Sequence, residues 1–141
     1  MIRAQEVLGQ RPAWSHFRAE MDHALRCGFD DVRGGIYNRG VGDHPATQTD
    51  KVWWAQAEML AALSDGTHHE RNPRYEKAMD QLIHFVAQYQ TSPKDQIWLD
   101  TVTAEGVVKS GGKAHMWKAN YHDVRALIKF IENSGFQLEM P

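Results

Sequence analysis

Trp54 and Glu58 are spaced so that together they could bind a sugar. On a helix, residues four positions apart lie on the same face. An indole ring can cover the apolar C–H face of a sugar, and a carboxylate can accept hydrogen bonds from sugar hydroxyl groups. The alternative is that the adjacent tryptophans, Trp53 and Trp54, pack in the core while Glu58 is solvated or ion-paired. The spacing alone leaves both interpretations open.

His122 is a candidate for proton transfer because the sequence around it predicts the start of a helix at about residues 121–123. The positive end of a helix dipole disfavours a protonated imidazole. A neutral imidazole near pH 7 can accept a proton, so His122 could act as a general base. The alternative is a structural histidine that is bonded to the backbone at a helix start.

The sequence contains no recognised motif for a metal or a nucleotide. It has no HExxH, no CxxC, no glycine-rich phosphate-binding loop and no G-x-S-x-G. The adjacent histidines His68 and His69 are unsuited to binding one metal together. Cys27 has no base near it in the sequence, and we interpret it as a small buried residue. We therefore expect neither a metal nor a cofactor.

Helical periodicity dominates the chain, and we expect an all-α protein with small β-hairpins in its loops. The clearest helix begins at Asn72-Pro73, a capping residue followed by a proline in the first turn, and Thr91 ends it. Asp50 is the expected cap of another. Extended segments at 34–42 and 97–102 are interpreted as hairpins or loops. The predicted helices are about 12–27 (with Pro12 in the first turn), 50–64, 73–90 and 121–134, with a short fifth near 4–9.

Composition indicates one globular domain, residues 1–141. Sixteen Lys and Arg against eighteen Asp and Glu give a net charge of −2, which argues against nucleic-acid binding. The longest apolar run, 59–63, is far too short to span a membrane. The N-terminus has no apolar signal core, and a single cysteine suits a reducing compartment. We therefore expect a cytoplasmic protein.

Three segments occur together in a recognisable order: GGIY at 34–37, KVWWAQAE at 51–58 and WKANYHDVR at 117–125. In order and separation they resemble the C-terminal part of the N-acylglucosamine 2-epimerase family, which also contains cellobiose 2-epimerases and mannose-type aldose–ketose isomerases. The resemblance covers about residues 24–132. It implies an (α/α)6 barrel, a toroid of six helical hairpins, of which this chain would form about the last third.

The same resemblance implies a site and a reaction. It implies that His122 is a catalytic acid/base, that Trp54 and Trp117 line a sugar pocket, and that Glu58 faces the substrate or the histidine. We add two further substrate-binding candidates from the 51–58 segment, Trp53 and Gln56. The implied reaction removes the C2 proton of an open-chain monosaccharide or disaccharide, forms an enediol or enediolate, and reprotonates it without a metal or nicotinamide.

The family's second catalytic histidine, which is followed three residues later by Glu, has no match here. Ala19 and Arg26 stand at that offset from His16 and His23. One histidine can move a proton between C2 and C1 on one face, so isomerisation suits this chain better than epimerisation. Helices absent from the barrel would leave apolar faces exposed, which predicts a homo-oligomer or a missing N-terminal portion. The alternatives are a truncated, inactive remnant that binds a carbohydrate or a protein, and an unrelated helical interaction module.

Overall fold

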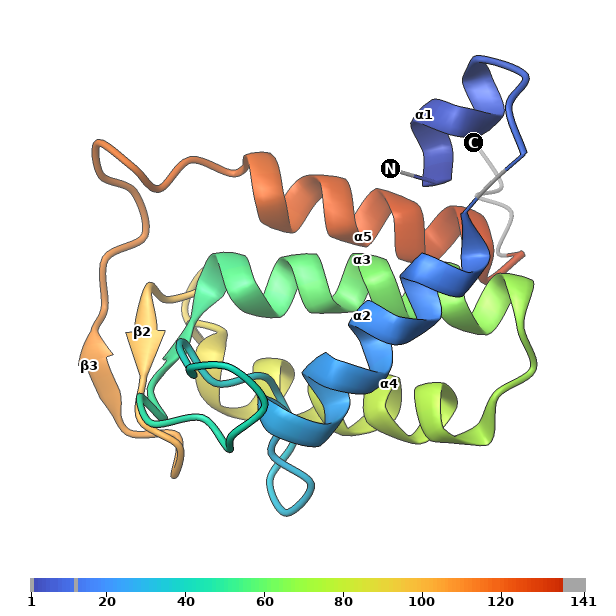
Figure 1. Ribbon diagram of the computed structural model, residues 1–141. Helices are drawn as coiled ribbons and strands as arrows, with labels where there is room; N and C mark the ends of the chain where they lie inside the picture. The colour runs from blue at the N-terminus through green and yellow to red at the C-terminus, as the bar shows by residue number, and fades with distance from the viewer. Residues whose placement is uncertain (1, 12, 136–141) are drawn as a thin grey trace, which may run out of the picture.

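The computed structural model describes residues 2–11 and 13–135, which form a mostly helical protein with one small sheet (Figure 1). Pro12, predicted in the first turn of a helix, lies outside the described residues. A π-helical segment, η1, continues α4, and three short strands lie in the loops. The elements are α1 (Ile2–Val7), α2 (Trp14–Cys27), β1 (Lys51–Val52), α3 (Trp53–His69), α4 (Pro73–Phe85), η1 (Val86–Gln90), β2 (Thr101–Val102), β3 (Val108–Ser110) and α5 (Tyr121–Asn133).

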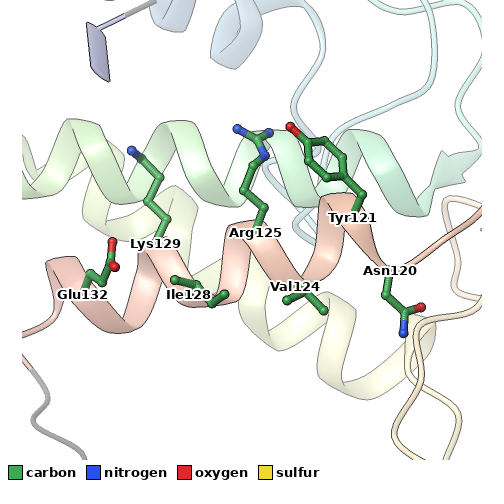
Figure 2. A pocket seen from close by; sticks show the side chains of 7 residues that line it. All are labelled: Asn120, Tyr121, Val124, Arg125, Ile128, Lys129 and Glu132. Atoms are coloured by element: carbon green, nitrogen blue, oxygen red, sulfur yellow. The ribbon is translucent and has the colours of Figure 1, made fainter. Parts of the chain in front are cut away.

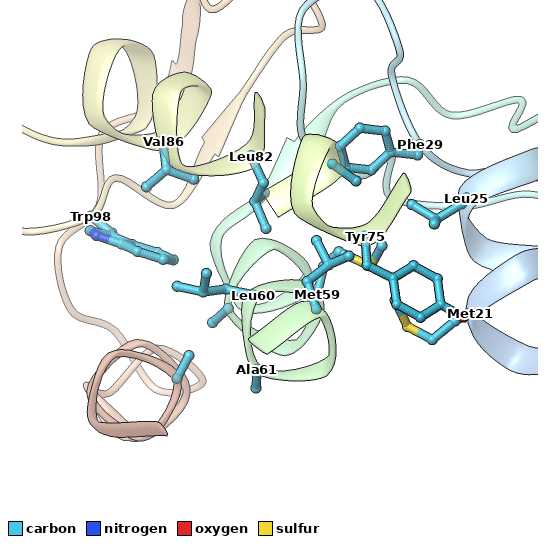
Figure 3. Packing of buried hydrophobic residues seen from close by; sticks show 14 residues of the cluster. Met21, Leu25, Phe29, Met59, Leu60, Ala61, Tyr75, Leu82, Val86 and Trp98 are labelled. Atoms are coloured by element: carbon cyan, nitrogen blue, oxygen red, sulfur yellow. The ribbon is translucent and has the colours of Figure 1, made fainter. Parts of the chain in front are cut away.

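Helix α3 is the centre of the fold. It packs against α4 on one side and α5 on the other, while α2 crosses in front of it in the view of Figure 1. Figure 3 shows Met59 and Leu60 of α3 in the apolar core, with Trp98 to one side and Met21 of α2 to the other. Apolar residues around most of the circumference of α3 predict a helix that is buried on several sides, and the structure confirms this.

The predicted start of α3 at Asp50 is wrong. The Asp50 carboxylate caps no helix and instead accepts a hydrogen bond from Lys109 Nζ at 2.7 Å. Residues 51–52 form β1, which pairs with β2 in the antiparallel order β1-β2-β3. The helix therefore begins only at Trp53, whose amide donates to the carbonyl of Asp100 at 2.8 Å.

The predicted end of α3 is also wrong, because the helix continues past Ser64 to His69. Gly66 lies inside it against the Tyr75 ring of α4. A Cβ at Gly66 would lie 2.8 Å from Tyr75 Cδ2, so a larger residue would push the two helices apart. The glycine serves close packing here rather than helix termination.

The other helix boundaries largely follow their local signals. The Asn72 side chain accepts a hydrogen bond from the Arg74 amide at 3.0 Å, which confirms the predicted cap of α4. The amide of Gly28 donates to the carbonyl of Ala24 at the end of α2, and Cys27 just before it is half-buried. Residues 34–42, predicted to form a hairpin or loop, contain no strand and form isolated bridges, such as the one between Ile36 and Phe29. Residues 97–102 contribute strand β2.

Helix α5 packs closely against α3 along its length. Its fully buried apolar residue is Ala126, and Asp123 is also buried. Four apolar side chains of α5, which we call the α5 apolar face, are instead 36–51% exposed: Val124, Leu127, Ile128 and Ile131. Exposed apolar residues clustered on one helix are typical of a surface that another element covers.

Candidate active site

The imidazole of His122 is paired with the carboxylate of Glu58. Helices α3 and α5 run side by side in the same direction (Figure 1), which brings the first turn of α5 against the middle of α3. Nδ1 of His122 lies 2.7 Å from Oε1 of Glu58. Arg125, one turn further along α5, donates a hydrogen bond to the same oxygen through Nη2. One carboxylate oxygen thus receives two donors from α5.

The protonation states of this group follow from its contacts. Burial favours a raised pKa for Glu58, but hydrogen bonds from Arg125 and His122 outweigh it, and the pKa lies below its usual value. An ionised carboxylate can only accept, so Nδ1 of His122 carries the proton that it donates. In neutral His122 the lone pair is then on Nε2. The side chain is one-third exposed, so it is partly open to solvent and could accept a proton from a ligand.

Two aromatic rings lie close to His122. The indole of Trp54, one turn before Glu58 on α3, has its centroid 6.4 Å from the imidazole at an interplanar angle of 50°. The ring of Tyr121 lies 5.2 Å from the imidazole, nearly perpendicular to it. Trp54 is 41% exposed, so much of its surface remains available for a ligand. The structure therefore brings together three of the predicted site residues: Trp54, Glu58 and His122.

An open cavity of about 570 Å³ adjoins Trp54 and Glu58, whereas His122 is not among the residues that line it. Trp54 and Glu58 of α3 line it together with Arg125 of α5, and Tyr37 and Asn38 contribute from the loop after α2. This volume is typical of small-molecule sites. Apolar residues of α2, including Phe17 and Met21, form the opposite wall.

A second groove, of about 440 Å³, runs along the outer surface of α5 (Figure 2). Arg125 and Lys129 line both hollows. In Figure 2 the side chains of Arg125 and Tyr121 project to the same side of α5, and the guanidinium lies 5.5 Å from the centre of the Tyr121 ring. The Arg125 guanidinium lies between the two hollows and is ion-paired with Glu58 of α3.

Trp117 lies apart from this group. It belongs to a tight turn at residues 115–118, in which the amides and carbonyls of His115 and Lys118 bond to each other. Its side chain is 81% exposed and projects into solvent rather than packing against Trp54. Its predicted contact with a sugar stays a prediction.

Trp53 and Gln56 lie in the scaffold beneath the site. Trp53 is 5% exposed, with the ammonium of Lys118 5.1 Å from the centre of its ring. Gln56 is fully buried, where its Oε1 accepts from the Ile36 amide at 2.9 Å and its Nε2 donates to the Ile36 carbonyl at 2.7 Å. A Cβ on Gly35, which has φ +85°, would lie 2.7 Å from Gln56 Oε1. These bonds fix the 34–37 segment against α3, and direct sugar contact by Trp53 or Gln56 stays a prediction.

Sequence reasoning missed two features of this region. Asp123, in the first turn of α5, is only 6% exposed, and no side-chain cap bond is formed at the start of that helix. A second histidine–carboxylate pair joins His115 Nε2 to Asp100 Oδ2 at 2.6 Å. The three-residue spacing of His122 and Arg125 could have indicated that both face Glu58, since residues three apart share a helix face.

No helix within 2–11 and 13–135 is long and apolar enough to cross a membrane. The same residues contain no group of three or more His, Cys, Asp or Glu side chains that could hold a metal ion.

Comparison with known proteins places this arrangement in context. A sequence model of the family described as N-acylglucosamine 2-epimerase (GlcNAc 2-epimerase) matches residues 7–126. The cellobiose 2-epimerase of Eubacterium cellulosolvens is 23% identical over 91 residues, which cover 64% of this chain and 22% of that protein.

Solved structures show the same likeness. The cellobiose 2-epimerase of Spirochaeta thermophila is 27% identical with a TM-score of 0.69, over 86% of this chain and 31% of that one. A D-mannose isomerase is 21% identical with a TM-score of 0.75, over 82% of this chain and 29% of that one. The chain thus spans about a fifth of the curated relative and less than a third of each of these two structures.

Proposed function

The chain belongs to the N-acylglucosamine 2-epimerase family, and we propose that it carries the His122 part of a sugar 2-epimerase or aldose–ketose isomerase site. The observation that carries the proposal is the hydrogen bond between His122 Nδ1 and Glu58 Oε1, beside the exposed ring of Trp54. That bond leaves Nε2 as the basic nitrogen. The relatives named for cellobiose 2-epimerase and mannose isomerase support a sugar as the substrate.

The proposed reaction begins with an open-chain aldose in the cavity beside Trp54. Nε2 of His122 takes the proton from C2, the C2–H electron pair forms a C1–C2 double bond, and the carbonyl electrons move to O1. The resulting imidazolium is stabilised by the Glu58 carboxylate, which Arg125 keeps ionised. In an isomerisation, His122 returns the proton to C1, while the O2 proton moves to O1 and C2 becomes a carbonyl. General acid–base catalysis of this kind contributes about 10²- to 10⁴-fold.

A single imidazole favours isomerisation over epimerisation. Epimerisation at C2 removes a proton from one face and delivers one to the other, which calls for two acid/base groups. His122 is the one histidine that the structure pairs with Glu58 and Trp54 in the described part of the chain. A second group would have to come from another polypeptide segment.

We further propose that the chain forms about the last third of an (α/α)6 barrel and that another copy, or further polypeptide, covers the α5 apolar face. The support is the exposure of this face and the share of each relative that the chain spans. The same observations favour the alternative function, a non-catalytic remnant that binds a carbohydrate or a protein through the cavity beside Trp54.

Solvent exchange tests the proposal. The protein is incubated in deuterium oxide with mannose, glucose, N-acetylmannosamine or cellobiose, and NMR follows deuterium at C2 of the aldose and at C1 of any ketose formed. We expect label in at least one sugar, and its loss in His122→Gln. His16→Gln is the matched control, because His16 lies on the surface of α2, paired with Glu20 at 3.0 Å.

The possible results separate the two functions. Exchange that survives in His122→Gln contradicts the catalytic role of this residue. Sugar-induced changes in tryptophan fluorescence without any exchange support the non-catalytic alternative. If no sugar exchanges or binds, both proposals fail.

A further inference from the structure

The second histidine–carboxylate pair lies at the base of the turn that carries Trp117. His115 Nε2 lies 2.6 Å from Asp100 Oδ2, and the other oxygen of Asp100 accepts from Thr101 Oγ1 at 2.6 Å. Asp100 immediately precedes β2, and its side chain is only 15% exposed. The sheet therefore provides a fixed anchor for the imidazole of His115.

The other ring nitrogen of His115 holds the turn itself. The amide of Trp117 donates to Nδ1 of His115 at 3.2 Å. A side-chain acceptor that binds the amide two residues later is the arrangement that Asn and Asp use in Asx turns. Nδ1 must therefore be unprotonated, and Nε2 carries the hydrogen that Asp100 accepts. One neutral tautomer satisfies both partners.

The rest of the turn is anchored on α3. The His115 ring meets the Trp53 ring edge-to-face, with centroids 5.7 Å apart. Lys118 is 1% exposed, with its ammonium over the same indole. Between these anchors, Met116 and Trp117 are more than 80% exposed. The backbone of the turn is thus held at both ends while the indole of Trp117 points outward.

We propose that His115 is a positioning residue that holds Trp117 in place when neutral and releases it when protonated. Protonation turns Nδ1 from an acceptor into a donor. The hydrogen bond from the Trp117 amide is then lost, because the amide N–H and the Nδ1–H are both donors and repel each other. The bond from Nε2 to Asp100 persists in both states, so the ring stays attached to the sheet. The inference rests on the proposed function only in assigning Trp117 to the sugar.

The Asp100 carboxylate contacts Nε2 of His115 directly. The Lys118 ammonium follows in the same turn and interacts electrostatically with both Asp100 and Asp123 of α5. Trp53, the residue that α3 packs against the ring, is uncharged.

Fluorine NMR of protein labelled with 5-fluorotryptophan tests the inference without a sugar. The Trp117 signal is the one lost in Trp117→Phe, and the signal of Trp98, which is 8% exposed, serves as an internal control for unfolding. Between about pH 8 and pH 5 we expect the wild-type Trp117 signal to shift in a single-proton transition while the Trp98 signal stays in place.

Two variants separate the proposed role from a general effect of pH. In His115→Asn the amide oxygen can still accept from the Trp117 amide but cannot titrate, so the Trp117 signal should not move with pH. In His115→Leu the acceptor is lost, so the signal should stay near its low-pH position throughout. An unchanging wild-type signal, or the wild-type transition persisting in His115→Asn, would overturn the proposal.

A sugar readout then links the turn to the proposed function. For a sugar that the wild type converts, we expect KM to rise about five-fold on acidification, the scale of one lost hydrogen bond, and this rise to be absent in His115→Asn. A KM that stays constant for the wild type on acidification would contradict a positioning role, whatever happens to kcat. If the wild type converts no sugar, the proposed function fails, whereas the fluorine signals still decide the role of His115.

Discussion

His122 Nδ1 and Glu58 Oε1 lie 2.7 Å apart although the two residues are separated by 64 positions in the sequence. The parallel packing of α3 and α5 creates this contact, and Arg125 reinforces it from the same face of α5. A carboxylate that holds Nδ1–H leaves Nε2 basic and stabilises the imidazolium that forms when Nε2 takes a proton. This relationship connects the fold to the proposed proton transfer.

Glu58→Gln should therefore damage catalysis more than folding. The amide of glutamine has no charge to stabilise the imidazolium, and its NH₂ group can select the opposite tautomer of His122. We expect C2 exchange to slow by about 10²- to 10⁴-fold, the range typical of acid–base catalysis. Glu76→Gln, on the exposed face of α4, is the control. Equal exchange rates in the two variants would show that Glu58 has no part in the reaction.

The adjacent tryptophans should respond in different ways. Trp54→Ala should raise KM about ten-fold, because covering roughly 50 Å² of sugar C–H surface is worth about 1.3 kcal/mol. It should lower the free energy of unfolding by less than Trp53→Ala does, since the ring of Trp54 is 41% exposed. Trp53→Ala should lower the free energy of unfolding by about 3–5 kcal/mol, as expected for a residue that is 5% exposed.

Urea unfolding and sugar kinetics on the two tryptophan variants measure these effects. If Trp54→Ala only destabilises the fold and leaves KM unchanged, Trp54 is a packing residue and the helical interaction module becomes the better account.

The buried ion pair between Lys51 and Asp30 should be essential for stability. Lys51 Nζ is fully buried, 2.8 Å from Asp30 Oδ2 and 2.7 Å from the Gly34 carbonyl. Lys51→Met leaves a buried carboxylate without its partner, which should cost about 3–5 kcal/mol in urea unfolding. The exposed pair of Lys109 with Asp50 provides the control, and Lys109→Met should cost far less. Similar decreases in the free energy of unfolding for Lys51→Met and Lys109→Met would contradict this role for Lys51.

The same pair predicts a pH dependence of stability. Burial alone would raise the pKa of Asp30, but hydrogen bonds from Lys51 and from the Arg33 and Val32 amides lower the pKa below its ordinary value of 3.8. A depressed folded-state pKa contributes stability above the unfolded pKa, and this is lost as pH falls through the folded value. The stability difference between wild type and Asp30→Asn should therefore be full at neutral pH and shrink below about pH 3.8. If the stability difference between wild type and Asp30→Asn does not change with pH, the lowered pKa of Asp30 is refuted.

The α5 apolar face should control assembly. Sedimentation at micromolar concentration should show a species larger than the monomer, because this face includes Ile128 and Val124, which are about half exposed. Ile128→Lys with Val124→Lys should shift the protein toward monomer, since burying either charge in an interface is unfavourable. A compact, stable wild-type monomer would contradict covering by a second copy.

Local signals predicted the parts of the fold that depend on neighbouring residues. The cap at Asn72 and the apolar stripe of α4 are examples, because the start of a helix and its buried face are determined by residues that are close together in the sequence. The bounds of α3 were missed because they depend on distant partners. Strand β1 needs residues 101–102, and Gly66 is explained only by the Tyr75 ring of the next helix.

The site was predictable as a set of residues but not as a geometry. Spacing placed Trp54 and Glu58 on one helix face, and the family resemblance pointed to His122. The bond between Glu58 and His122 depends on how α3 and α5 pack, which no local pattern specifies. Trp117 was grouped with the pocket by the same resemblance, whereas its exposed position depends on the turn that His115 and Lys118 hold.

The central claim is that Nε2 of His122 takes a proton from C2 of a sugar. Its most direct test is the rate at which solvent deuterium enters C2, measured for the wild type, His122→Gln and the surface control His16→Gln. The account predicts label with the wild type and the control, and none with His122→Gln. Equal labelling in all three proteins would contradict it.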